Sequence, residues 1–187
     1  MRAAVLTDER PRLEMADVAA PVPGPGEALL RITGCGICGS DLHLASQLAA
    51  PGAVLGHEIA GVVAGRGAGV DPARWPDGTA VVARPFGGCG SCSFCQNGRA
   101  DHCAQFQLIG LERPGGFAEF VTVRGDELFQ LPAAVAPGEQ PLVEPLAVVR
   151  HAFRRGDVTP LDRVAVLGAG PIGLAAVAWA KAIGVDA

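Results

Sequence analysis

Apolar residues recur in short runs through the first two-thirds of the chain, separated by turns rich in proline and glycine. Short apolar runs bounded by such turns predict strands rather than helices. The two shortest of these strands flank a turn at Arg10 and Pro11, and four longer ones are predicted at residues 27–34, 58–67, 78–85 and 115–123. Many short strands joined by frequent turns indicate a β-rich, partly closed sheet or barrel.

The pattern changes in the last third of the chain. Leu146, Val149 and Phe153 have helical spacing and predict a helix over residues 141–156 that ends at Gly156. A strand at 163–167, a glycine turn and a helix at 171–184 are predicted next, and the last three residues are typical of the start of another strand.

Two domains therefore follow from the pattern. Residues 1–140 are expected to form the β-rich domain, and residues 141–187 a connecting helix and the first βα unit of an α/β domain. One βα unit does not build a parallel sheet that is covered on both faces. We therefore expect the chain to be a truncated part of a longer protein.

Composition and charge exclude several classes of protein. Hydrophobic residues make up 49% of the chain and charged residues 18%, which favours a folded core over disorder. The formal charge of −4 is unfavourable for binding nucleic acid. The first residues lack a signal-peptide core, and no apolar run reaches the roughly 20 residues that span a membrane. A soluble, cytoplasmic protein is expected.

Four of the six cysteines are closely spaced, as Cys-x2-Cys-x2-Cys-x7-Cys: Cys89, Cys92, Cys95 and Cys103. Four thiolates joined by short turns meet the needs of a closed, structural zinc site. An iron–sulfur cluster fits less well, because of the spacing to the fourth cysteine and the lack of a proline after it. Disulfides over such short spacings would be strained, and they suit secreted scaffolds. We predict a zinc lobe at residues 88–103 that holds a loop and performs no chemistry.

The remaining cysteines, Cys35 and Cys38, raise the question of a second metal site. His57 and Glu58 stand together at the start of a predicted strand, and Glu144 stands at the start of the later helix. Cysteine, histidine and carboxylate ligands from distant segments are typical of catalytic zinc, which keeps one open position. Singly, each has an ordinary explanation, as a packing cysteine, a structural histidine or a solvated glutamate. Their occurrence beside a zinc lobe favours the metal site.

A glycine-rich turn follows the predicted strand at 163–167. Gly168, Gly170, Pro171, Ile172 and Gly173 are the candidate cofactor-binding residues. In a strand–turn–helix, such glycines allow the tight turn, the approach of a pyrophosphate and close packing of the helix. The phosphate then lies at the helix N-terminus, and proline suits its first position. The alternative is an ordinary glycine turn of an α/β protein.

Six motifs occur together in one order: "GCGICGSDLH", "GHEIAGVV", the four-cysteine lobe, "GGFAEFV", "EPLAV" and "VLGAGPIGL". In these motifs the chain resembles, over essentially its whole length, the zinc-dependent alcohol and polyol dehydrogenases of the medium-chain dehydrogenase/reductase superfamily. The resemblance implies a GroES-like catalytic domain followed by a Rossmann NAD(P)-binding domain. Members of the family are roughly twice as long, and a homo-oligomer (dimer or tetramer) is implied for the full-length protein.

The resemblance also assigns residues to the catalytic zinc. Cys38 and His57 match ligands of the family, and Glu58 and Glu144 match two carboxylates that share or alternate in the remaining positions. Which carboxylate contacts zinc at rest is left open. Asp41 matches a carboxylate that orients the His57 ring. Glu144 stands where typical alcohol dehydrogenases have a second cysteine, which is closer to the polyol, glucose and threonine dehydrogenases.

The implied reaction transfers a hydride from a secondary alcohol or polyol, a small molecule, to NAD(P)+, with two zinc ions per chain, one catalytic and one structural. Ser40 would accept the hydroxyl proton of the substrate and pass it toward His43 and solvent. Alternatively, Ser40 caps a helix through residues 41–48 and His43 is a solvated surface residue. The residue that separates NAD from NADP is expected beyond Ala187.

Other functions stay open at this point. A threonine- or glucose-dehydrogenase-like activity is the alternative within enzymes, and a non-catalytic zinc-binding fragment is the alternative outside them. No nucleic-acid or membrane partner is expected. Cys35 is predicted to be a small buried residue that ends its strand, so the apparent Cys-x-x-Cys supplies one metal ligand, Cys38.

Overall fold

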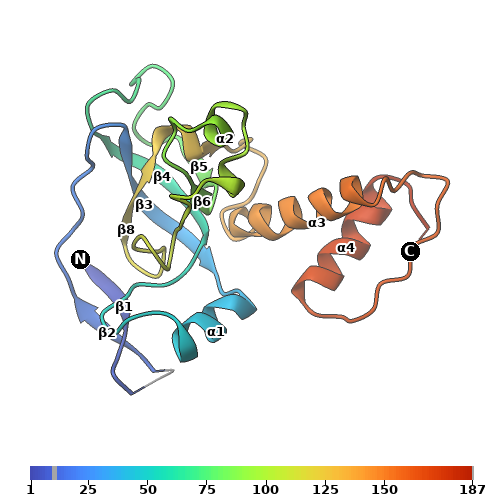
Figure 1. The fold of residues 1–187 in the computed structure, drawn as a ribbon, viewed down its shortest axis with the longest axis horizontal. Helices are drawn as coiled ribbons and strands as arrows, with labels where there is room; N and C mark the ends of the chain where they lie inside the picture. The colour runs from blue at the N-terminus through green and yellow to red at the C-terminus, as the bar shows by residue number, and fades with distance from the viewer. Residues whose placement is uncertain (10–11, 187) are drawn as a thin grey trace. The chain divides into compact units, whose positions relative to one another are not determined.

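The computed structural model describes residues 1–9 and 12–186, and the turn predicted at Arg10 and Pro11 lies outside these described residues. The chain divides into two compact units, Met1–Pro141 and Leu142–Ala187. Figure 1 labels the main helices and strands of each unit. Among the described residues, no helix is long and apolar enough to cross a membrane.

An antiparallel five-stranded sheet forms the centre of the first unit, in the order β8-β3-β4-β5-β9. Its strands are β3 (Glu27–Gly36), β4 (Glu58–Arg66), β5 (Ala80–Ala83), β8 (Phe120–Arg124) and β9 (Leu128–Gln130). A separate antiparallel pair joins β1 (Arg2–Leu6) and β2 (Leu13–Asp17). The sheet is not closed into a barrel, because each of its end strands is hydrogen-bonded to one neighbour only in the described part of the chain.

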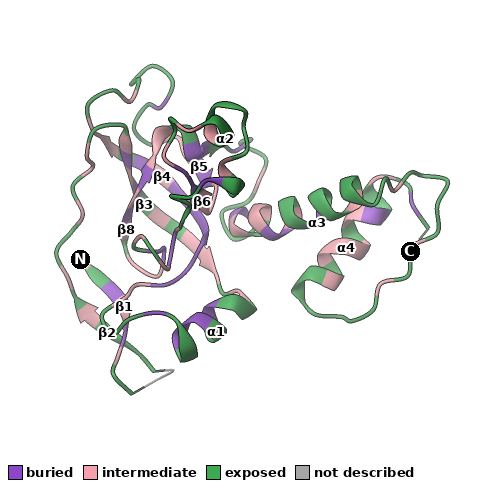
Figure 2. Ribbon diagram, viewed as in Figure 1, coloured by how far each residue is buried: buried purple, intermediate pink, exposed green. Residues whose placement is uncertain are grey.

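Burial explains why the sheet forms where it does. Leu30, Ile59, Val81 and Val121 come from four different strands, and each is at most 2% exposed. Apolar residues that meet on one face of a sheet gain free energy by leaving water. Figure 2 shows the buried residues concentrated on these strands. A smaller cluster packs helix α1 (Gly39–Gln47) against the first strand.

The lobe at residues 88–103 and its surroundings contain only short elements. The strands β6 (Phe86–Gly87) and β7 (Gln107–Leu108) pair at its base, and the lobe contains α2 (Ser93–Gln96) and a 3₁₀ turn at Ala100–His102. Two further 3₁₀ turns lie at Gly125–Glu127 and at Gln140–Leu142, and the second of these ends on the first residue of the second unit. A lobe with so little regular structure needs cross-links of another kind to hold its shape.

The second unit contains the two predicted helices, α3 (Val143–Arg155) and α4 (Pro171–Ala182), which pack against each other. The strand predicted at 163–167 is wrong: only Arg163 is paired, in an isolated parallel bridge with Asp186. A parallel strand needs neighbours along its length, and the described part of this unit supplies only that bridge. Leu167 is accordingly 99% exposed. The βα unit is therefore present as a turn and helix without its strand.

Candidate functional site

Asp41 connects the start of helix α1 to the residues before β4. Its Oδ2 accepts a hydrogen bond of 2.9 Å from the backbone N–H of Cys38, and its Oδ1 accepts one of 3.3 Å from Gly56. Gly56 has φ +93°, in the left-handed region that glycine tolerates. Asp41 is only 2% exposed, so its carboxylate forms hydrogen bonds with these protein groups in place of water. The junction brings Cys38 close to His57.

The His57 ring is held by the same carboxylate. Nδ1 of His57 lies 3.2 Å from Oδ1 of Asp41, which favours the proton on Nδ1 and leaves Nε2 free for a ligand. On its other side, Nε2 lies 3.5 Å from Oγ of Ser40. The hydrogen bond to Asp41 raises the pKa of His57 to about 9, against the opposing effect of burial.

Glu58 completes the group, and a glycine makes room for it. Gly36 of β3 pairs directly with Glu58 of β4. A Cβ atom at position 36 would lie 1.8 Å from Oε2 of Glu58, so a larger residue would displace the carboxylate. Burial raises the pKa of Glu58. The role of Gly36 was not predicted from the sequence, because a glycine near the end of a strand gives no sign of its cross-strand partner.

Cys38, His57 and Glu58 form what we call the mixed site. Their ligand atoms all lie within 4.8 Å of one another. Tetrahedral zinc places such sulfur, nitrogen and oxygen ligands about 3.5 Å apart, so the atoms need to approach by about 1.3 Å at most. One thiol, one imidazole and one carboxylate form a donor set that suits zinc with a further open position. Glu144 lies in the first turn of α3, in the second unit, and its part in this site stays a prediction.

Cys35 has a different environment from Cys38. It pairs with Ile59 between β3 and β4, and it packs against the core of the sheet. Burial, with the nearby charges of Asp41 and Glu58, raises the pKa of the Cys35 thiol to about 12. Among the described residues, the group of potential ligand atoms that contains Cys38 consists of Cys38, His57 and Glu58, without Cys35. The structure therefore places Cys35 as a small packing residue near the end of its strand.

Ser40 and His43 lie on the first turns of α1. Both are exposed, and Ser40 is the second residue of the helix, with Cys38 at its N-cap. The N-cap is Cys38, whose backbone N–H donates to Asp41, so Ser40 does not occupy the cap position and the alternative in which it caps the helix is wrong. Ser40 instead faces Nε2 of His57, and His43 follows it by almost one turn on the same helix.

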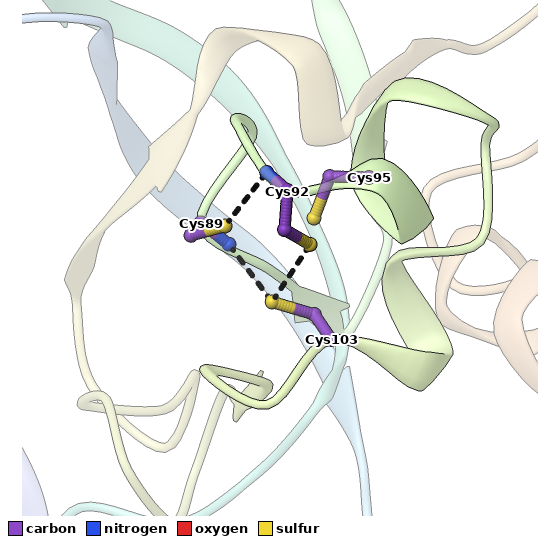
Figure 3. Close-up of side chains that lie close together, drawn as sticks. All are labelled: Cys89, Cys92, Cys95 and Cys103. Carbon is purple, nitrogen blue, oxygen red and sulfur yellow. Dashed lines mark hydrogen bonds between the residues drawn. The ribbon is translucent and has the colours of Figure 1, made fainter.

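The four-cysteine lobe gathers its thiols around one point (Figure 3). The four sulfur atoms lie within 4.8 Å of one another, and those of Cys92 and Cys103 are 3.7 Å apart. Zinc–sulfur bonds of about 2.3 Å in a tetrahedron require sulfur atoms about 3.8 Å apart. All four cysteines are free thiols in the structure. The donor set and its spacing therefore fit a closed zinc site.

Backbone N–H groups of the lobe are directed at the sulfur atoms. Cys89 receives hydrogen bonds from Ser91 and from the amide of Cys92, and these lower its pKa to about 5. Amides of Cys89 and Gln105 likewise lower the pKa of Cys103. Burial raises the pKa of Cys95 to about 11. Stabilised thiolates are the form that binds metal.

The glycine turn leads into α4 in the second unit. Gly168 has φ +109°, and a Cβ at Gly173 would lie 2.0 Å from the carbonyl oxygen of Gly168. Only glycine at 173 therefore lets the helix approach the turn this closely. Pro171 is the first helical residue after Gly170, and Ile172 beside it is 48% exposed. A Cβ at Gly168 or Gly170 would meet no described atom within 4 Å, so the backbone there is accessible to a ligand.

Comparisons with known proteins agree on one family. The family model of the alcohol dehydrogenase GroES-like domain matches residues 24–133. L-galactonate-5-dehydrogenase of Escherichia coli (strain K12) is 40% identical over 170 residues, which cover 89% of this chain and 49% of that protein. The chain spans about half the length of the curated relatives it matches.

Solved structures give the same result. The crystal structure of galactitol-1-phosphate dehydrogenase from Escherichia coli superimposes with a TM-score of 0.91 at 32% identity, over 99% of this chain and 54% of that one. The structure of acetophenone reductase from Geotrichum candidum NBRC 4597, in complex with NAD, gives a TM-score of 0.88 at 34% identity, over 98% and 55%. At these identities the likeness extends to the sequence as well as the fold.

Proposed function

Because the chain belongs to the zinc-type alcohol and polyol dehydrogenases of the medium-chain dehydrogenase/reductase superfamily, we propose that its full-length protein transfers a hydride from a secondary alcohol or polyol to NAD(P)+. A polyol is favoured, since L-galactonate and galactitol-1-phosphate, in the names of two similar proteins, are polyhydroxylated. The observation that carries the proposal is the mixed site, with three ligand types within 4.8 Å.

The mixed site would hold the catalytic zinc through Cys38, His57 and Glu58, with Glu144 as the alternating carboxylate. When bound there, zinc supplies a Lewis acid that lowers the pKa of the substrate hydroxyl. Asp41 is a positioning residue: its hydrogen bond of 3.2 Å to Nδ1 keeps Nε2 of His57 available for the metal. Gly36 keeps the space for the Glu58 carboxylate open.

Ser40 and His43 would move the substrate proton to solvent. Oγ of Ser40 lies 3.5 Å from Nε2 of His57, so the hydroxyl lies beside one of the atoms that would hold the metal. His43 is exposed on the same helix, where an imidazole exchanges protons readily with water near neutral pH. The chain thus offers a path from a half-buried site to bulk solvent over one turn of helix.

The glycine turn would bind the cofactor. Gly168, Gly170 and Gly173 shape a backbone that a pyrophosphate can approach, and Pro171 and Ile172 begin the helix whose N-terminus faces it. The nicotinamide accepts the hydride. The lobe with Cys89, Cys92, Cys95 and Cys103 would hold the second, structural zinc, because four thiolates leave no open position. A cytoplasmic homo-oligomer is part of the proposal.

Steady-state reduction of NAD+ and NADP+ by the zinc-loaded full-length protein tests this function. The substrates are a panel of secondary alcohols, polyols, sugar acids, glucose and threonine. We expect turnover with at least one polyhydroxylated substrate and its loss after removal of zinc. Turnover with threonine or glucose alone would establish the alternative substrates. A protein that binds two zinc ions and turns over none of the panel would be a non-catalytic zinc-binding protein, contrary to the proposal.

A further inference from the structure

Arg124, the last residue of β8, extends its guanidinium into the base of the four-cysteine lobe. Its Nη1 donates a hydrogen bond to the carbonyl oxygen of Gly88, directly before Cys89. Cβ atoms built at Gly87 and Gly90 would lie 3.6 Å from Nη1 and 3.9 Å from Nη2 of Arg124. The guanidinium therefore borders the backbone on both sides of Cys89.

Two carboxylates hold the guanidinium in this position. Asp126 accepts a forked pair of hydrogen bonds, from Nε at 3.0 Å and from Nη2 at 2.6 Å. Glu127, which is fully buried, lies 3.8 Å from Nε and also accepts the backbone N–H of Arg124 at 3.1 Å. Glu127 is itself fixed by two hydrogen bonds of 3.0 Å from Arg113. An arginine bound in this way has little freedom to turn away from the lobe.

The charge of a closed four-cysteine site explains why an arginine would be useful there. Four thiolates around Zn²⁺ leave two negative charges in excess, and the buried sulfur of Cys103 shows that part of this charge is removed from water. A cation beside the backbone of Cys89 offsets part of that cost. The direct hydrogen bond to Gly88 also fixes the turn that presents the Cys89 sulfur.

We propose that Arg124 is a positioning residue for the structural metal: its charge and its hydrogen bond to Gly88 slow the loss of zinc from the four-cysteine lobe. The inference rests on the proposed function, in which this lobe holds zinc. It differs from a purely mechanical role of Arg124 in tying a loop to the sheet. A mechanical tie would depend on hydrogen bonds alone, whereas charge compensation also depends on the positive charge at position 124.

Zinc release from the full-length protein tests the inference. The zinc-loaded protein is mixed with excess 4-(2-pyridylazo)resorcinol, and release is followed by absorbance. The variants are Arg124→Met, which removes the charge, and Arg124→Lys, which keeps it. Arg66→Met is the matched control, because Arg66 also donates to one backbone carbonyl and one carboxylate, those of Trp75 and Asp77.

We expect Arg124→Met to release the lobe zinc at least 10-fold faster than the unchanged protein. The rate for Arg124→Lys should lie between those of Arg124→Met and the unchanged protein. The rate for Arg66→Met should stay within twofold of the unchanged protein. Equal rates for Arg124→Met and Arg66→Met would overturn the inference. Equal rates for the Lys and Met variants, both fast, would also overturn it, because the charge would then not matter. If the Met variant does not fold, the Lys variant provides the comparison: it is expected to release zinc faster than Arg66→Met, and a rate equal to that control would overturn the inference.

A failure of the underlying proposed function gives a different result. The lobe phase of release is assigned with Cys103→Ser, which removes one ligand of the lobe and is expected to lower bound zinc by one ion per chain. If Cys103→Ser leaves the zinc content unchanged, the lobe does not hold zinc and the premise is wrong. If zinc content falls but Arg124→Met has no effect on release, the premise holds and the inference about Arg124 is wrong.

Discussion

Replacing Arg113 with methionine is expected to destabilise the protein strongly. Glu127 has no exposed side-chain surface, and Arg113 donates both of its hydrogen bonds of 3.0 Å to the Glu127 carboxylate. Methionine fills a similar volume but leaves the carboxylate without its bidentate partner. Removing one member of a buried ion pair costs about 3–5 kcal/mol, because the other charge stays buried and uncompensated.

Two features favour the lower end of that range. Nε of Arg124 remains 3.8 Å from the Glu127 carboxylate and compensates part of its charge. Nε of Arg113 is a buried N–H without a hydrogen-bond partner among the described residues, so the substitution also removes one unsatisfied donor. We therefore expect a loss of about 3 kcal/mol in the free energy of unfolding.

Urea unfolding of the zinc-loaded full-length protein, followed by circular dichroism, measures this loss. Glu127→Gln removes the charge but keeps the shape, and we expect it to cost about 1.5–3 kcal/mol for the lost charged hydrogen bonds. The double variant should be less destabilised than the sum of the two single variants, because no buried charge is left unpaired. A loss below about 1 kcal/mol for Arg113→Met, or full additivity, would refute the reasoning.

Two further predictions concern the mixed site. In the metal-free protein, the hydrogen bond to Asp41 is the main cause that raises the His57 pKa from 6.5 to about 9. The interaction of protonated His57 with Asp41 therefore stabilises the folded state fully below pH 6.5, and this stabilisation is lost as the pH rises to about 9. The free energy of unfolding, measured by urea titration at several pH values, should fall across that window and fall less in Asp41→Asn; identical pH dependence would contradict the assignment. Gly36→Ala should weaken zinc binding at the mixed site about 10-fold or more, because its Cβ would meet the Glu58 carboxylate. Gly39→Ala, whose Cβ meets no described atom within 4 Å, is the control in a chelator competition, and equal affinities for the two variants would disprove the role of Gly36.

Much of the sheet could be predicted from the sequence because its strands carry long apolar runs. The runs of β3 and β4 are buried on the sheet, and the spacing of the four cysteines is enough to predict a local cluster of thiols. The strand at 163–167 was predicted from a similar run, RVAVL, but a parallel strand depends on neighbours that the described chain does not supply. Apolar runs thus predict strands only where partners are present.

Contacts between side chains of different segments could not be predicted from the sequence, for a different reason. The space that Gly36 leaves for Glu58 depends on the pairing of β3 with β4. The burial of Glu127 between Arg113 and Arg124 depends on how the chain folds around that carboxylate. Local residue patterns contain no information on register between strands. The residues of the mixed site could be proposed individually, and the resemblance implied that Asp41 orients His57. The hydrogen bonds of Asp41 to the backbone of Cys38 and Gly56 emerge only from the fold.

The central claim is that the mixed site binds the zinc that activates the substrate, and one paired measurement tests it most directly. Zinc content and NAD(P)-linked turnover are determined for the full-length protein and for its Cys38→Ser and Cys35→Ser variants. We expect two zinc ions per chain in the unchanged protein and in Cys35→Ser, with similar turnover, because Cys35 is a partly buried residue that packs against the core. Cys38→Ser should hold one zinc ion and lose turnover. Full turnover in Cys38→Ser, or loss of the catalytic zinc in Cys35→Ser, would contradict the account.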